Sequence, residues 1–152
     1  MIIVTGGAGF IGSNLVKALN ERGRNDIIIV DDLTDGRKVR NLTNLDYFDY
    51  IDCIDFDNAI ADGTFDCGPI DVVFHQGACA DTMEYDGRYM MKNNFEGSKN
   101  LFHFCQERRI PFIYASSAST YGYGRNGFRE DPACEEALNP YAYSKLFMDR
   151  YV

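Results

Sequence analysis

Short apolar runs alternate along the chain with stretches whose apolar residues recur every three or four positions. The runs are typical of strands buried on both faces and span Ile2–Val4, Asp26–Val30, Ile70–His75 and Pro111–Ser117. The mixed aromatic and acidic stretch Tyr47–Ile54 favours one more short strand. Helical spacing and end signals predict helices from Ile11 to about Gly23, over Phe56–Ala61, over Arg88–Arg108 and from Asn139-Pro140 onward. This order predicts an α/β fold with a doubly wound parallel sheet.

A glycine pattern lies between the first predicted strand and the first predicted helix. Gly7, Gly9 and Gly12 form G-x-G-x-x-G, and Gly6 precedes them. Glycines there permit a tight turn and a close approach of a pyrophosphate to the free amides of the helix end. An acidic residue, Asp31, follows about 20 residues later, at the end of the second strand. A glycine pattern alone also marks ordinary turns, but this context favours a Rossmann-type dinucleotide-binding domain over residues 1–152.

Composition and charge narrow the function further. A chain of 152 residues fits one domain. Its net charge of −8 and lack of a basic stripe disfavour nucleic acid and anionic membrane surfaces as partners. No apolar run has the length of a membrane span, and the first residues lack the pattern of a signal peptide. The five cysteines form no C-x-x-C pair and the two histidines stand apart, so we expect reduced thiols, a cytoplasmic protein and no bound metal.

Ligands of doubly wound sheets bind beyond the carboxyl ends of the strands. Asp31 is placed to accept the hydroxyls of an adenosine ribose. Arg37 and Lys38 lie just beyond it, where a cation would meet a 2′-phosphate, although these two charges also suit a solvated loop. The small residues after the fourth strand leave room for a ligand, or form an ordinary connecting loop; they are Gln76, Gly77, Ala78, Cys79 and Ala80. One of Asn93 and Asn94 is expected to reach back to this loop.

Tyr141 and Lys145 are four positions apart and share a helix face. A free tyrosine has a pKa of ~10, so lowering it to about 7 takes ~4 kcal/mol of preferential stabilisation of the phenolate. A lysine ammonium one turn away and a cationic nicotinamide ring both have the required sign. Ser117, with Ser116 as the second choice, would hold the same substrate oxygen. Tyrosine and lysine at this spacing are also common on helices without catalytic function.

Together these motifs resemble the extended short-chain dehydrogenase/reductase family. The matching stretches are T-G-G-A-G-F-I-G at 5–12, S-S-A-x-x-Y-G at 116–122, Y-x-x-x-K at 141–145, and Asn94 with Gly97-Ser98. Stretches 31–36, 75–79, 86–94 and 110–118 are similar to the members of that family that epimerise an ADP-linked heptose for the lipopolysaccharide inner core.

The resemblance implies a mechanism and a set of residues. Bound NADP would take a hydride from an ADP-heptose-type sugar nucleotide and return it to the opposite face, with Tyr141 as acid/base, Ser117 holding the oxygen and Lys145 tuning Tyr141. The residues that match cofactor-contacting positions are Phe10, Ile11, Asp31, Asp32, Lys38, Gln76, Gly77, Ala78, Cys79, Ala80, Asn93 and Lys145. The predicted cofactor site also includes Gly6, Gly9, Gly12 and Tyr141. It also implies a homo-oligomer. Asp31 favours NAD, because a carboxylate repels a 2′-phosphate, whereas Lys38 and the resemblance favour NADP; we expect NADP.

Length is the main departure from that family. Its epimerases are about twice as long, and their second half supplies the substrate domain and a second acid/base lysine. We therefore expect this chain to be the N-terminal portion, with its substrate domain largely absent. Two alternatives remain open: another nucleotide-sugar epimerase or reductase, and a dinucleotide-binding module without turnover. A sugar-nucleotide 4,6-dehydratase is disfavoured, because Ala118-Ser119 occupy the place of its acidic pair.

Overall fold

The computed structural model describes all residues, 1–152. The strands are β1 (Ile2–Thr5), β2 (Ile27–Asp31), β3 (Asp49–Asp52), β4 (Val72–His75) and β5 (Phe112–Tyr114). The α-helices are α1 (Phe10–Asn20), α2 (Cys53–Ala61), α3 (Gly87–Met90), α4 (Gly97–Arg108) and α5 (Pro140–Tyr151). The π-helical segment η2 (Met91–Glu96) joins α3 to α4, and the 3-10 segments are η1 (Gly36–Asn41), η3 (Ala118–Tyr121) and η4 (Pro132–Cys134).

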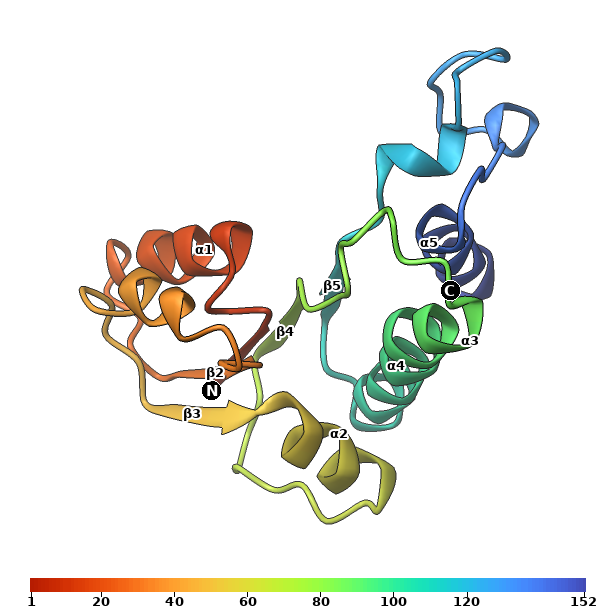
Figure 1. The fold of residues 1–152 in the computed structure, drawn as a ribbon. Helices are drawn as coiled ribbons and strands as arrows, with labels where there is room; N and C mark the ends of the chain where they lie inside the picture. The colour runs from red at the N-terminus through yellow and green to blue at the C-terminus, as the bar shows by residue number, and fades with distance from the viewer. The chain divides into compact units, whose positions relative to one another are not determined.

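The chain divides into two compact units (Figure 1). The first, which we name the sheet unit, comprises Met1–Gly77 and Asn100–Tyr114 and contains the whole sheet. The second, which we name the helical unit, comprises Ala78–Lys99 and Ala115–Val152 and contains α3, η2 and α5.

The sheet has the strand order β3-β2-β1-β4-β5, and every neighbouring pair is parallel. This order, with the chain crossing from one side of β1 to the other after β3, confirms the predicted doubly wound sheet of the Rossmann type. Because all strands run the same way, their carboxyl ends share one edge. The turn after β1, the end of β2 and the loop after β4 therefore meet at that edge.

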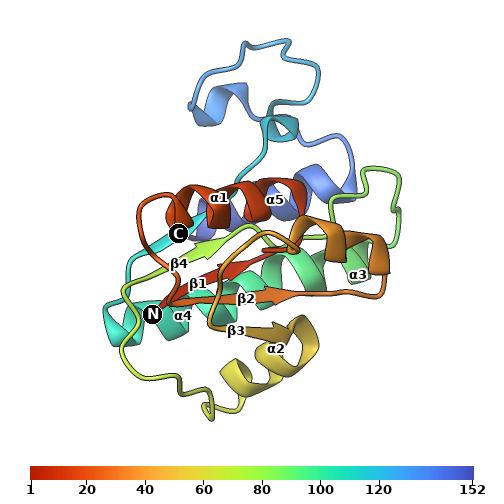
Figure 2. The same cartoon turned by 90° about the vertical axis from the view of Figure 1, so that its left-hand side faces the viewer.

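Two apolar cores cover the two faces of the sheet because side chains alternate along each strand. Ile3 of β1 belongs to one core, whereas Ile2 and Val4 belong to the other. Phe56 of α2 packs on the first face and Val16 of α1 on the second, and Figure 2 shows α1 and α2 on opposite sides of the sheet. The first core consists of Ile3, Ile28, Val30, Phe56, Ile60, Val73, Leu101, Phe104 and Cys105, and the second of Ile2, Val4, Ala8, Val16, Ile27, Ile29 and Leu42.

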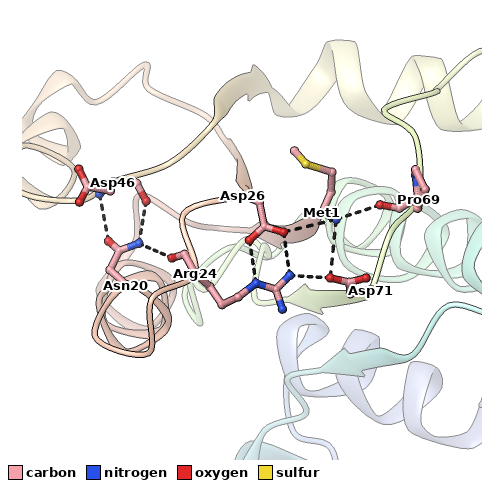
Figure 3. A network of polar contacts seen from close by, with 7 residues as sticks. All are labelled: Met1, Asn20, Arg24, Asp26, Asp46, Pro69 and Asp71. Atoms are coloured by element: carbon pink, nitrogen blue, oxygen red, sulfur yellow. Dashed lines mark hydrogen bonds and ion pairs between the residues drawn. The ribbon is translucent and has the colours of Figure 1, made fainter.

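A charged network joins the opposite, amino-terminal edge of the sheet (Figure 3). Arg24 donates from Nε and Nη2 to the two carboxylate oxygens of Asp26, at 2.7 and 2.8 Å, and also contacts Asp71. The Met1 ammonium donates to the Pro69 carbonyl at 2.9 Å and lies 3.7 Å from each of the two carboxylates. Since Met1, Asp26 and Asp71 precede β1, β2 and β4, this network aligns the starts of three strands.

The predicted helix over Arg88–Arg108 is wrong in its middle, because α3 and α4 are separated by the π-helical segment η2. A π turn accommodates an extra residue in the helix. In η2 the adjacent Asn94 and Phe95 are both buried, at 1% and 8% exposure. The sequence pattern did not reveal the insertion, because its advantage depends on what Asn94 contacts in the folded chain.

Candidate functional site

The turn after β1 leaves the amino end of α1 open to an anion. Gly6 has a φ of +67°, a left-handed conformation that favours glycine. Gly9 is the N-cap of α1, and no side chain caps the first turn. The amides of Phe10, Ile11 and Gly12 therefore lack both an intrahelical acceptor and a cap. Such a helix end suits the oxygens of a pyrophosphate.

Gly6 and Gly12 lie where two backbone segments come too close to leave room for a Cβ. A Cβ on Gly12 would lie 2.1 Å from the Gly6 carbonyl oxygen, so α1 rests directly on the turn. A Cβ on Gly6 would lie 2.7 Å from the Gly77 nitrogen, so the turns after β1 and β4 also touch. The side chains of Phe10 and Ile11 beside this turn are 83% and 64% exposed and are free to contact a ligand.

Asp31 ends β2 with both carboxylate oxygens engaged. Its Oδ2 accepts from the Ala8 amide at 2.8 Å, and its Oδ1 accepts from the Asp32 amide at 2.7 Å and from Lys38 Nζ at 2.8 Å. Lys38 Nζ also donates to the Asp32 carbonyl at 2.8 Å. Burial opposes the charge on Lys38, but the hydrogen bond to Asp31 and the charges of Asp31 and Asp32 raise the pKa of the ammonium. The Asp31 carboxylate, which we expect to accept ribose hydroxyls, is thus already paired with the Lys38 ammonium.

The loop after β4 is held against the end of β1. The Gly77 amide donates to Thr5 Oγ1 at 3.0 Å, and the same hydroxyl is 2.7 Å from His75 Nδ1. The Gln76 amide donates to the Thr5 carbonyl at 3.1 Å. The sheet unit therefore brings Gln76 and Gly77 beside the glycine turn.

In the helical unit, Asn94 fixes the small-residue loop Ala78–Ala80. Its Oδ1 accepts from the Cys79 amide at 2.8 Å, and its Nδ2 donates to the Cys79 carbonyl at 2.9 Å and to Ser144 Oγ at 3.1 Å. The expectation that one of the two asparagines reaches this loop is confirmed for Asn94. Asn93, which was expected to bind the cofactor, is exposed.

α5 begins as its sequence predicts. Asn139 is the N-cap and accepts from the Ala142 amide at 2.7 Å, and Pro140 is the first helical residue. This start places Tyr141 in the first turn and Lys145 one turn later. The two side chains thus stand on one helix whose amino end is fixed by a local cap.

Lys145 is 6% exposed, and its Nζ donates to the Ala115 carbonyl at 3.0 Å. Burial lowers the pKa of this ammonium, and the Asp149 carboxylate one turn later acts in the opposite direction. Asp149 also accepts a hydrogen bond from Ser116. An ammonium with a single protein acceptor retains two N–H groups for a ligand, which fits the hydroxyls of a ribose.

Ser117 precedes η3 and caps it. Its Oγ accepts from the Ser119 amide at 3.2 Å and lies 2.8 Å from Ser119 Oγ. No hydrogen bond joins the side chains of Ser117, Tyr141 and Lys145 to one another. The helical unit thus supplies a hydroxyl, a phenol and an ammonium, the groups needed for proton exchange with an alcohol.

Sequence reasoning missed Ser144 and Asp149. Ser144 is fully buried, donates to the Tyr141 carbonyl at 2.7 Å and accepts from the Asn94 side-chain amide. Its only sequence signal is its place beside Lys145. Asp149 repeats the four-residue spacing of Tyr141 and Lys145, but only the fold shows that it meets Ser116.

The structure contains no cluster of three or more His, Cys, Asp or Glu side chains that would hold a metal ion. All five cysteines are free thiols. None of the helices combines the length and the apolar character needed to cross a membrane.

Comparison with known proteins extends these observations. The family model described as "NAD dependent epimerase/dehydratase family" matches residues 2–152. A curated relative from Alkalilimnicola ehrlichii, described as ADP-L-glycero-D-manno-heptose-6-epimerase, is 59% identical over all 152 residues, which correspond to 47% of that relative. The chain therefore spans about half the length of this relative.

Solved structures of epimerases are also similar to this chain. The Helicobacter pylori ADP-L-glycero-D-manno-heptose-6-epimerase superposes with a TM-score of 0.82 at 28% identity, over 99% of this chain and 49% of that one. The UDP-glucuronic acid 4-epimerase of Bacillus cereus in complex with NAD gives a TM-score of 0.79 at 27% identity, over 98% of this chain and 50% of that one.

Proposed function

Because the chain belongs to the NAD dependent epimerase/dehydratase family, we propose that it is the cofactor-binding and acid/base half of an ADP-glycero-manno-heptose 6-epimerase. The observation that carries the proposal is the 59% identity along the whole chain to the A. ehrlichii relative. Ser117, Tyr141 and Lys145 are all present. The reaction would serve inner-core heptose synthesis for lipopolysaccharide.

We propose NADP as the cofactor, bound by its pyrophosphate at the open end of α1. The pairing of Asp31 with Lys38 supports this choice, because the ammonium offsets the carboxylate that would otherwise repel a 2′-phosphate. Lys38 keeps 35% of its side chain exposed, so it can meet such a phosphate. In the helical unit, the remaining donors of Lys145 would bind ribose hydroxyls. When bound, the cofactor would supply a reversible hydride acceptor for the sugar.

Tyr141 would exchange the proton of the hydroxyl at the epimerising carbon. The Tyr141 phenolate would remove the hydroxyl proton of that carbon as the carbonyl forms. The second acid/base, a lysine that the resemblance places in the half of the family's enzymes that this chain does not span, would act at the opposite face. Ser117 would donate to the substrate oxygen and hold it. The Lys145 ammonium favours the phenolate by its charge.

Two further parts of the proposal concern the protein's setting. The five cysteines without C-x-x-C pairs support a cytoplasmic protein. The aromatic side chains Tyr143, Phe147 and Tyr151 of α5 are 49%, 39% and 43% exposed, which supports a homo-oligomer. Light scattering coupled to gel filtration would measure the oligomeric state.

The second candidate is a dinucleotide-binding module without turnover. The coverage of 47% of the A. ehrlichii relative favours it for this chain taken alone. The two candidates share cofactor binding and differ in whether sugar is converted. The test must therefore measure binding and turnover separately.

NADPH and NADH are titrated into the chain by nicotinamide fluorescence, which is readable because the chain contains no tryptophan. We expect tighter binding of NADPH, and a Lys38→Ala variant that loses the preference. Binding of neither nucleotide at millimolar concentration would refute the proposed cofactor site.

Turnover of the ADP-heptose is then measured for the chain alone and for the chain joined to the C-terminal half of the A. ehrlichii relative. We expect the joined protein to epimerise the sugar, and Tyr141→Phe to abolish turnover while cofactor affinity stays nearly unchanged. Full turnover by Tyr141→Phe would remove Tyr141 from its role. Binding without turnover in the joined protein would favour the module.

A further inference from the structure

The backbone of Ala8, in the middle of the glycine turn, is held on both sides of its Cα. Its N–H donates to Asp31 Oδ2 at 2.8 Å. Its carbonyl oxygen accepts from Asn41 Nδ2, also at 2.8 Å. Ala8 itself is fully buried between Gly7 and Gly9. The turn therefore has one partner at the end of β2 and another at the end of η1.

Asn41 and Lys38 lie on the same short segment. They are three residues apart in η1, which is one turn of a 3-10 helix, so their side chains leave it in similar directions. Lys38 Nζ donates to Asp31 Oδ1 at 2.8 Å. The contacts thus form a closed ring that runs from Asp31 to Ala8, on to Asn41, along η1 to Lys38 and back to Asp31.

Packing does little to fix η1. None of its residues is buried, and the side chain of Val39 is 51% exposed. The first residue after it, Leu42, is 6% exposed and belongs to the core on the α1 face. The chain is therefore anchored by packing just after η1, whereas η1 itself is joined to the glycine turn by the hydrogen bond of Asn41.

We propose that Asn41 is a positioning residue that keeps Lys38 in place for the 2′-phosphate of NADP. This inference rests on the proposed function, in which Lys38 meets that phosphate. Without the Asn41–Ala8 bond, η1 loses its attachment to the glycine turn, and the Lys38 ammonium samples more positions. A ligand with a 2′-phosphate then loses part of its contact, whereas NAD, which lacks that phosphate, does not depend on where Lys38 lies.

A role confined to the shape of the glycine turn predicts a different result. The turn serves the pyrophosphate, which NADPH and NADH share. A variant that only deformed the turn would therefore weaken both ligands by the same factor. The ratio of the two dissociation constants distinguishes positioning of Lys38 from general support of the turn.

The test titrates NADPH and NADH by nicotinamide fluorescence into the whole chain and into Asn41→Ala, Lys38→Ala, the double variant and Asn44→Ala. Asn44 is the matched control, because it lies three residues beyond Asn41, is exposed and has no side-chain hydrogen bond. We expect Asn41→Ala to raise the dissociation constant of NADPH by about three- to tenfold, the change that corresponds to the loss of one hydrogen bond. NADH binding by Asn41→Ala should stay within about twofold of the unchanged chain, because NADH has no 2′-phosphate for Lys38 to contact. Asn44→Ala should bind both nucleotides within about twofold of the unchanged chain, because it keeps the Asn41–Ala8 hydrogen bond.

The double variant provides the second readout. If Asn41 acts through Lys38, adding Asn41→Ala to Lys38→Ala causes no further loss of NADPH affinity. Equal weakening of both nucleotides, an unchanged NADPH affinity in Asn41→Ala, or additive losses in the double variant would each overturn the inference. An unchanged NADPH preference in Lys38→Ala would instead overturn the proposed role of Lys38, and the inference with it, while leaving NADP as the proposed cofactor. Asn41→Leu, which keeps the bulk and removes the donor, replaces Asn41→Ala if the latter fails to fold.

Discussion

Replacement of Gly12 by alanine tests whether the glycine pattern serves close packing. Alanine normally stabilises a helix interior relative to glycine by about 1 kcal/mol. Gly12 is the third residue of α1, so helix propensity alone predicts a gain in stability. The structure predicts the reverse, because the new Cβ would lie 2.1 Å from the Gly6 carbonyl oxygen and 2.8 Å from Gly7 Cα.

The magnitude follows from those distances. Since real Cβ atoms essentially never come closer than 3.0 Å to another heavy atom, α1 and the turn must separate by at least about 1 Å. The obstructing atoms belong to the backbone and cannot rotate aside, so we take the upper end of the overpacking cost, about 3 kcal/mol. After the gain in helix propensity, Gly12→Ala should lose about 2 kcal/mol of unfolding free energy. If this separation also removes one charge-assisted hydrogen bond to the pyrophosphate, the dissociation constant of NADPH should rise by about tenfold or more.

Urea unfolding followed by circular dichroism and NADPH titration by fluorescence measure these two effects. Gly87→Ala is the matched control, because Gly87 starts α3, has no positive φ, and leaves open space within 4 Å of the position that a new Cβ would occupy. This control should be as stable as the unchanged chain or gain about 0.4–1 kcal/mol. If Gly12→Ala unfolds at the same or a higher urea concentration and binds NADPH normally, the close approach of α1 to the turn does not constrain residue 12.

Three other outcomes follow from burial. Phe56→Ala removes a 1%-exposed ring that meets Phe65 edge-on at 4.9 Å, and should cost about 3–5 kcal/mol in urea unfolding, whereas a loss below about 1 kcal/mol would place Phe56 outside the core. Burial raises the pKa of Cys105 to about 12, so mass spectrometry at pH 8 should show that iodoacetamide modifies it about a thousandfold more slowly than an ordinary thiol; equal rates would contradict its burial. Burial lowers the pKa of Lys145 below 10.5, so the unfolded chain holds this proton more tightly than the folded chain. The free energy of unfolding should therefore rise with pH between the lowered pKa and 10.5, and Lys145→Met should lack this rise. Identical pH profiles of the two proteins would refute the lowered pKa.

The parts of the fold that obey local rules were predictable. Strand runs such as Ile27–Val30 are apolar at every position because both faces are covered, and this pattern is visible in the sequence. The start of α5 follows from Asn139 as a cap and Pro140 at the first helical position. The glycine turn needs a left-handed residue and a close helix, which the spacing of its glycines already expresses.

The partners of the site residues were not predictable in the same way. Asn94 meets Cys79 and Ser144, which lie 15 and 50 positions away in the sequence. Asn41 meets Ala8, 33 positions away. No local propensity encodes such pairs, because each depends on where the sheet places two separate segments. The π turn at Asn94 was missed for the same reason.

The sequence by itself thus determined the order of the elements, the glycine turn and the residue types available for proton exchange, because these depend on spacing and on neighbours within one or two turns. The tertiary structure decided how those groups are used. It alone paired Asp31 with Lys38, tied Asn41 to the glycine turn and buried Lys145 against the Ala115 carbonyl. Hydrogen bonds and charges act over a few ångströms in space, whatever the separation along the chain, so they appear only after the chain has folded.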